Sequence, residues 1–72
     1  MPNTQGGVHV VTNPNGTGWV AQANGVILSR HRAKPTAIAK ARRLAKRHGE
    51  ELTIHRADGA VLETRSYEVS PI

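Results

Sequence analysis

The stretch "KPTAIAKARRLAKRHG", residues 34–49, decides the fold, because it predicts the single helix against which the rest of the chain must pack. Pro35 suits the first turn of a helix, where a backbone N–H is not needed, and Gly49 suits the left-handed residue that ends one. Alanines at positions 37, 39, 41 and 45 strengthen the preference for helix. Strand and turn patterns flank this stretch on both sides, so we expect one helix covering a sheet.

Strands are predicted on both sides of the helix. Before it, "VHVVTN" (8–13) and "WVAQA" (19–23) flank the turn cluster "PNGTG" (14–18), and "VILSR" (26–30) can return as a short third strand. The dipeptide Asn24-Gly25 readily forms the tight hairpin that this return requires. After the helix, "ELTIHR" (51–56) and "AVLETRSY" (60–67) predict a second hairpin around Asp58-Gly59.

These elements predict a small two-layer α+β domain. We expect an antiparallel sheet of four to five strands, made of two hairpins and packed by one helix, in the order β-β-(β)-α-β-β. Residues 1–7 are expected to form a flexible N-terminal lead, residues 8–68 a single domain, and residues 69–72 a C-terminal tail. A chain of 72 residues without cysteine has a thin core and no disulfide framework. No apolar run reaches the length of a membrane span, and the N-terminus lacks the pattern of a signal peptide, so a cytoplasmic protein is expected.

Charge is distributed unevenly along the chain. Ten Lys and Arg residues oppose five acidic ones, which gives a formal net charge of +5. All five acidic residues follow Gly49, so residues 1–49 carry +8 and residues 50–72 carry 2 − 5 = −3. This asymmetry indicates a polyanion, an acidic protein or an anionic surface as the partner.

Residues placed 100° apart divide the predicted helix into two faces. The apolar face consists of Ala37, Ile38, Ala41, Leu44, Ala45 and His48. The basic face consists of Lys40, Arg42, Arg43, Lys46 and Arg47, with Ala39 among them. The basic face contains like-charge pairs at i,i+4, each of which destabilises a helix by a few tenths of a kcal/mol. Helix stability therefore does not require this arrangement, although a solvated face remains an alternative.

A nucleic acid is the partner class that this face favours. Lys and Arg along one helix face can neutralise phosphates and release counterions, which gives affinity with little sequence specificity. We therefore predict an accessory protein that binds nucleic acid, with duplex DNA favoured over other forms. The predicted site comprises Arg30, Arg32, Lys40, Arg42, Arg43, Lys46 and Arg47. The alternative is a protein-interaction module, either a homodimer or an adaptor for an acidic partner protein.

Other functions have weaker support in the sequence. The apolar helix face is mostly alanine, which argues against insertion into a membrane or binding to calmodulin. Trp19 and Tyr67 are the only aromatic residues apart from the histidines, too few for the stacking platforms of single-strand recognition, and Trp19 is expected in the core. His9 and His55 can meet across the sheet, but no spacing predicts a metal site. No catalytic motif, cofactor loop or small-molecule substrate site is recognised, so we expect no enzyme.

Several short motifs resemble a bacterial family known only as a domain of unknown function, the family numbered 2188. The matching positions are His9-Val10-Val11, Asn13, Gly18-Trp19, Ala37-Ile38, Ala41-Arg42, Leu44-Ala45, Glu51-Leu52, Ile54-His55, Asp58-Gly59 and Arg65-Ser66-Tyr67. The resemblance implies one compact α+β domain and no established activity. Helices of this family usually carry acidic residues among the basic ones, and a Tyr-Gly-Asn-Asp-Pro tail is usual. This chain has neither feature, so its basic face is expected to be particular to this member.

Overall fold

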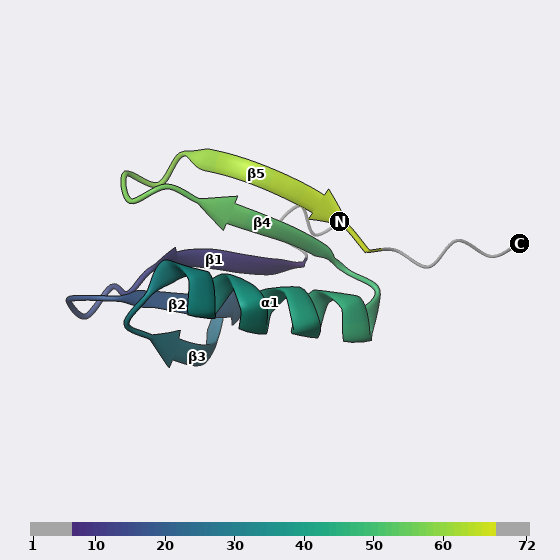
Figure 1. Ribbon diagram of the computed structural model, residues 1–72, viewed down its shortest axis with the longest axis horizontal. Coiled ribbons are helices and arrows are strands. Elements are labelled where there is room, and N and C mark those ends of the chain that lie inside the picture. Colours follow the sequence, from purple (N-terminus) through teal and green to yellow (C-terminus); the bar gives the residue numbers. More distant parts are fainter. Residues whose placement is uncertain (1–6, 68–72) are drawn as a thin grey trace, which may run out of the picture.

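The structure is a computed structural model that describes residues 7–67. Its elements are β1 (Val8–Thr12), β2 (Trp19–Ala23), β3 (Val26–His31), α1 (Lys34–His48), β4 (Glu51–His55) and β5 (Val61–Ser66) (Figure 1). The predicted α+β class and element order are confirmed, and the third strand is present with six residues. The predicted lead, apart from Gly7, and the predicted tail lie outside the described residues.

The five strands form one sheet in the order β3-β2-β1-β4-β5. Both hairpins are antiparallel as expected, but β1 and β4 pair in parallel at the centre, so the sheet is mixed. Two hairpin turns make β3 run in the same direction as β1. The helix then carries the chain back across the sheet, as a crossover between parallel strands requires, so β4 also runs in that direction. The expected purely antiparallel sheet is corrected at this one pair.

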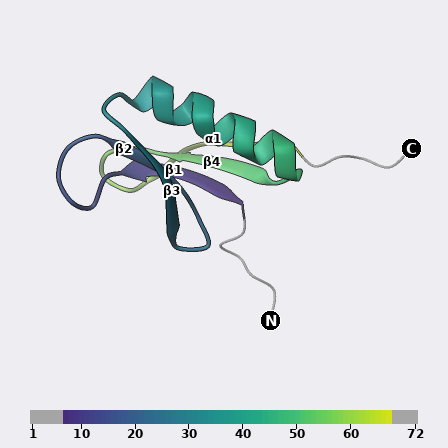
Figure 2. The same cartoon turned by 90° about the horizontal axis from the view of Figure 1, so that it is seen from below.

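The helix lies on one face of the sheet, as Figure 2 shows. Its contact side is a row of alanines at every fourth position, Ala37, Ala41 and Ala45, all fully buried. These small side chains allow the backbone of α1 to approach the sheet closely. Beneath them, β1 and β4 supply the large members of the core, namely Val8, Val10, Leu52 and Ile54. Trp19 was expected in the core and is instead half-buried and packed against it.

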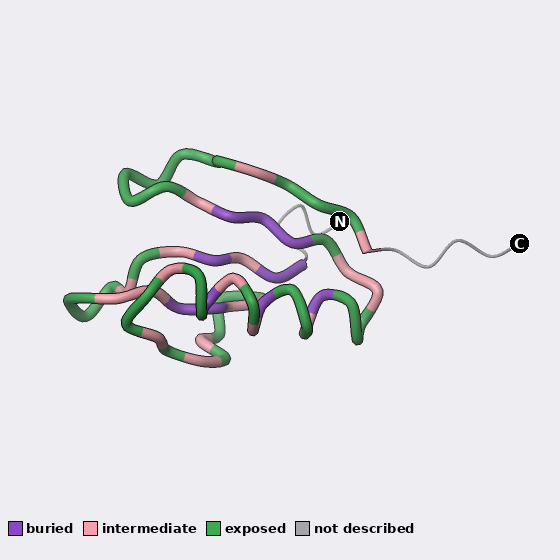
Figure 3. The backbone as a smooth tube through the Cα atoms, viewed as in Figure 1, coloured by how far each residue is buried: buried purple, intermediate pink, exposed green. Residues whose placement is uncertain are grey.

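The described elements are unequally covered by the helix. α1 contacts β1, β2, β3 and β4 but makes no contact with β5. Buried residues accordingly concentrate in β1, β2, β4 and the inner side of α1, whereas nearly all of β5 is exposed (Figure 3). β5 therefore forms a sheet edge that neither a helix nor a further described strand protects.

The C-terminal end of α1 is closed as the sequence predicts. Gly49 adopts a left-handed conformation with φ of 63°, and its N–H donates to the Lys46 carbonyl at 3.3 Å. The N–H of Glu50 donates to the Ala45 carbonyl at 2.9 Å, which completes a double hydrogen-bonded cap. His48 was expected on the packing face and is instead exposed, because it lies beside a hollow between α1 and the strands that is open to solvent.

Glycine is required where the chain enters β2. Gly18 has a φ of +96°, and a Cβ placed there would lie 2.5 Å from the carbonyl oxygen of His31. Its own carbonyl accepts a hydrogen bond from the N–H of Asn13, which closes the loop before β2. The predicted Asn24-Gly25 hairpin is also present, with φ values of 54° and 78°. The motif Gly18-Trp19 thus combines a close backbone approach with a residue that packs against the core.

Candidate nucleic-acid interface

The outer side of α1 is a continuous cationic surface, which we call the basic face and define as Lys40, Arg42, Arg43, Lys46 and Arg47. Four of these side chains are exposed, and Lys40 is half-buried. The residues span eight helical positions, which are seven steps of 1.5 Å, so the basic face is about 10 Å long. The buried alanine row on the opposite side of α1 fixes the rotation of the helix and therefore the outward direction of this face.

Acidic residues do not neutralise the basic face within the described part of the chain. α1 contains no acidic residue. The ion pairs of residues 7–67 lie elsewhere, between Arg56 and Asp58 and between Arg65 and Glu63. Glu63 also raises the pKa of the Arg65 guanidinium, through the hydrogen bond between them and then through its charge. The basic face is consequently free to attract an external anion.

Aromatic rings contact two lysines at the sides of α1. The Nζ atom of Lys46 lies 5.6 Å from the ring centre of Tyr67, and that of Lys34 lies 4.6 Å from the ring centre of Trp19. Both distances fall within the range of cation–π attraction. These contacts orient the lysines without cancelling their charge. Tyr67 also packs against the core.

The structure separates the remaining predicted site residues from the basic face. Arg30 pairs with Val20 in the register of β2 and β3, whereas the neighbouring Ala21 belongs to the core beneath α1. Side chains alternate between the two faces of a sheet, so Arg30 projects from the face opposite to α1. Arg32 is exposed in the connection between β3 and α1, near the start of the helix. The basic face therefore contains five of the seven predicted residues, and Arg30 does not belong to it.

A histidine pair links the two halves of the sheet, as the sequence allowed. His9 Nδ1 lies 3.0 Å from His55 Nε2, and His55 Nδ1 lies 3.1 Å from the carbonyl oxygen of Gly59. A carbonyl only accepts, so His55 donates through Nδ1 and, when neutral, accepts at Nε2 from His9. Within residues 7–67 no group of three or more His, Cys, Asp or Glu is placed to hold a metal ion. The pair therefore has a structural explanation.

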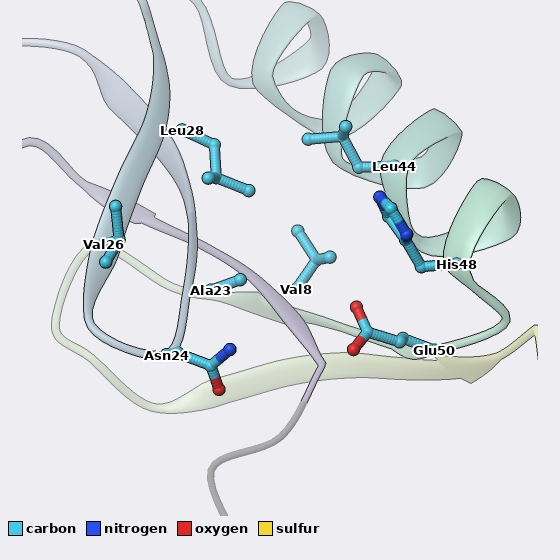
Figure 4. Close-up of a pocket in the computed structure, with 8 residues that line it drawn as sticks. All are labelled: Val8, Ala23, Asn24, Val26, Leu28, Leu44, His48 and Glu50. Atoms are coloured by element: carbon cyan, nitrogen blue, oxygen red, sulfur yellow. The ribbon is translucent and has the colours of Figure 1, made fainter.

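An apolar hollow of about 410 Å³ adjoins the C-terminal half of α1, and periodicity alone did not reveal it (Figure 4). Val8 and Ala23 form its floor, Leu28 lies on one side and Leu44 on the other. Leu28 remains 47% exposed because the hollow is open to solvent. His48 and Glu50 lie at its lower end, near the end of the helix. A bulge shifts the pairing of β2 with β3 beside this hollow. The alternation of side chains in a regular strand does not predict such a bulge.

The residues that carry the family resemblance mostly build the fold. His9, His55 and Gly59 form one hydrogen-bonded chain, and Ala37, Ala41 and Ala45 form the buried row of α1. Of the basic face, only Arg42 belongs to those motifs. In the described part of the chain, no helix has both the length and the apolar character needed to cross a membrane.

Comparison with known proteins assigns the chain to the family that its short motifs suggested. A family model described as "Uncharacterized protein conserved in bacteria (DUF2188)" matches residues 8–67, which are 60 of the 72 residues. The family suggested by the short motifs is thus confirmed by a match that covers the whole of the sheet and the helix. No curated protein and no solved structure matches the chain.

Proposed function

The chain belongs to this uncharacterized bacterial family, and we propose that it is a non-enzymatic accessory protein that binds duplex nucleic acid through the basic face of α1. The observation that carries this proposal is an exposed, acid-free row of cations that no ion pair in residues 7–67 neutralises. The cytoplasm, where duplex nucleic acid is abundant in bacteria, is the proposed place of action.

Phosphates are the proposed contacts, rather than base edges. A duplex presents one negative charge per roughly 1.7 Å of its axis when both strands are counted, so a length of about 10 Å carries about six phosphate charges on its two strands. The number of phosphates in reach is therefore comparable to the five cations of the basic face. α1 contains no Asn or Gln, the side chains that read adenine, so low sequence specificity is expected.

DNA is the favoured duplex on grounds of shape. The major groove of B-form DNA is about 12 Å wide and admits a helix about 10–12 Å in diameter. The major groove of A-form RNA is too deep and narrow for side chains to enter. α1 lies on top of the sheet, so its outer side can approach a wide groove while the strands stay clear of the duplex.

Paired variants with equal net charge test this proposal. Replacement of Arg43 and Arg47 by alanine removes two charges from the basic face, and replacement of Arg30 and Arg56 removes two charges from elsewhere. Fluorescence anisotropy of a labelled duplex should show roughly tenfold weaker binding for the first pair and a much smaller change for the second. Absence of binding by the wild type at low salt, or equal weakening by both pairs, would overturn the proposal.

An acidic protein is the alternative partner, and the apolar hollow is the observation that favours it. Lys40 and Arg47 lie one helical turn on either side of Leu44, which forms one wall of the hollow. An acidic segment with one large apolar side chain could contact both features at once. Replacement of Leu44 by serine should weaken such a partner and leave duplex binding unchanged, as measured by the same anisotropy assay and by pull-down with the acidic partner.

A further inference from the structure

Within residues 7–67, β5 is a sheet edge that no helix covers on either face. It is the last strand of the sheet, and α1 makes no contact with it. Five of its six residues are exposed, including Val61 and Leu62 at 59% and 57%. Unpaired backbone N–H and C=O groups on such an edge are a template for another strand. The question is which strand could occupy it.

The charges on β5 are complementary to those of a second, antiparallel copy. Glu63 and Arg65 stand two residues apart on one face, because they pair with Ile54 and Leu52 of the core. If two β5 strands pair about Thr64, each Glu63 lies directly opposite the Arg65 of the other copy. Pairing about Glu63 or about Arg65 would instead place like charges opposite each other, which is destabilising. Pairing centred on Thr64 therefore gives two attractive Glu63–Arg65 pairs between the two copies.

We propose that two copies of the chain associate through antiparallel pairing of β5 with β5, centred on Thr64. The two-fold axis is then perpendicular to the sheet, so both helices lie on the same side of a continuous ten-stranded sheet. This inference builds on the proposed function, because the dimer presents two copies of the basic face to one duplex.

The spacing of the two helices fits a duplex. α1 packs over the region of β1 and β2, and strands of one sheet lie about 4.8 Å apart. β1 and its counterpart would be separated by five strand spacings and β2 and its counterpart by seven, or roughly 24 to 34 Å. The upper value matches the 34–36 Å between half-sites that lie one helical turn apart. Because the twist of a sheet turns the two helices relative to each other, the spacing allows them to contact successive turns of one duplex in different orientations.

The opposite edge of the sheet, β3, does not favour a symmetric dimer in the same way. β3 carries Arg30 and His31 and no acidic residue, so two β3 strands lack opposite charges to pair. Pairing of β3 with the β5 of another copy would bring opposite charges together but is a head-to-tail contact, which gives rings or open chains rather than two-fold dimers. A distribution of species larger than a dimer would therefore indicate this arrangement instead.

A single strand pair between exposed edges is a small interface. Interfaces below about 1,200 Å² of total buried area belong to weak or transient complexes. Two chains of formal charge +5 also repel one another until an anion is present. The dimer is therefore expected to form on the duplex, which neutralises the cations and holds both copies at high local concentration.

Charge reversal on β5 provides the test. The variants are Glu63→Arg, Arg65→Glu and the double swap, which restores both opposite-charge pairs between copies and preserves the net charge. Binding isotherms are measured on duplexes of about 8 and about 24 base pairs, which hold one and two helices respectively. The wild type should bind the longer duplex with a Hill coefficient approaching about 2 and the shorter with a value of about 1. Each single variant should fall to about 1 on the longer duplex, and the double swap should recover the wild-type value.

Two outcomes overturn the dimer and leave duplex binding intact. These are wild-type binding to the longer duplex without cooperativity, and unchanged cooperativity in the single variants. If the wild type binds no duplex, the proposed function fails, and sedimentation equilibrium of the free protein at about 0.5 M salt, which screens the repulsion between the two chains, then decides the dimer. A monomer throughout the concentration range would exclude the pairing, and a dimer that both single variants lose and the double swap regains would establish it.

Discussion

Arg43 lies at the centre of the basic face, and Arg47 follows it at i+4 on the same side of α1. Two cations at this separation repel each other, so neither stabilises the helix through the other. Their exposure and lack of acidic neighbours within α1 leave attraction of an external anion as their principal electrostatic effect.

Replacement of Arg43 and Arg47 by lysine separates charge from shape. Lysine retains the positive charge but loses the planar, bidentate fork of arginine. If the contacts are phosphates met as point charges, affinity for duplex DNA should fall by less than about threefold, because counterion release is unchanged. A loss as large as that caused by alanine would instead indicate guanine recognition by the guanidinium groups, and competition with duplexes of different sequence would verify it.

His55 joins β1 to the β4–β5 turn through its two ring nitrogens. Replacement of His55 by alanine leaves His9 Nδ1 and the Gly59 carbonyl without these partners and should lower the free energy of unfolding by about 1–3 kcal/mol. Replacement of the exposed His48 by alanine is the control and should have a much smaller effect. Urea denaturation followed by circular dichroism measures both. Equal stability of the two variants would contradict a structural role for the histidine pair.

The backbone of β3 leaves no room for a side chain at Gly18. Replacement by alanine would strain a φ of +96° and place the Cβ 2.5 Å from the His31 carbonyl. Gly25 has a φ of +78° with open space around it, so its alanine variant carries the conformational cost alone, about 1–3 kcal/mol. Thermal unfolding should show a clearly larger loss for Gly18→Ala than for Gly25→Ala. A smaller or equal loss would mean that β3 can move away without cost.

At the scale of elements, α1 is the part of the fold that the sequence predicted most completely. Pro35, Gly49 and the alanine spacing located both ends and the buried side, because these signals are local. Its last turn was the exception. His48 falls on the packing side by angle, but it lies beside a hollow between α1 and the strands that is open to solvent, and such a hollow is not a local property of the sequence.

The alanine row sets the distance between α1 and the sheet, and its central member tests that packing. Ala41 is fully buried, so replacement by leucine should destabilise the protein by about 1–3 kcal/mol through overpacking. Ala39 is exposed among the basic residues, and the same substitution there should change stability by less than about 0.5 kcal/mol. Chemical denaturation compares the two. Similar values would mean that α1 can shift outward freely.

The strands were predicted individually better than they were predicted as a sheet. Turn dipeptides located both hairpins, because Asn24-Gly25 and Asp58-Gly59 act within a few residues. The parallel pairing of β1 with β4 joins residues more than 40 positions apart and depends on how α1 crosses the sheet. The seven predicted site residues do not all lie on one face, because strand pairing also decides the direction in which Arg30 projects. Arg30 is close to α1 in sequence, but the register of β2 with β3 directs it to the other face.

Positive charge gathers on one side of the two-layer domain. The helix layer carries the basic face, and the acidic residues of the described chain lie at the end of α1 and in the β4–β5 hairpin. This separation lets a polyanion contact α1 without lying against the acidic residues of the β4–β5 hairpin. The uncovered edge at β5 then offers a way to place a second basic face beside the first.

Duplex binding as a function of salt tests this account most directly. If five cations each neutralise one phosphate, the logarithm of the association constant should fall against the logarithm of salt concentration with a slope of about −4.5 per chain. Replacement of Arg43 and Arg47 by alanine should reduce the magnitude of the slope to about 2.7, since two phosphate contacts are lost. Replacement of Arg30 and Arg56 should leave it near its original value. A wild-type slope near zero, or a slope that both pairs change equally, would contradict the assignment of the basic face as the binding surface.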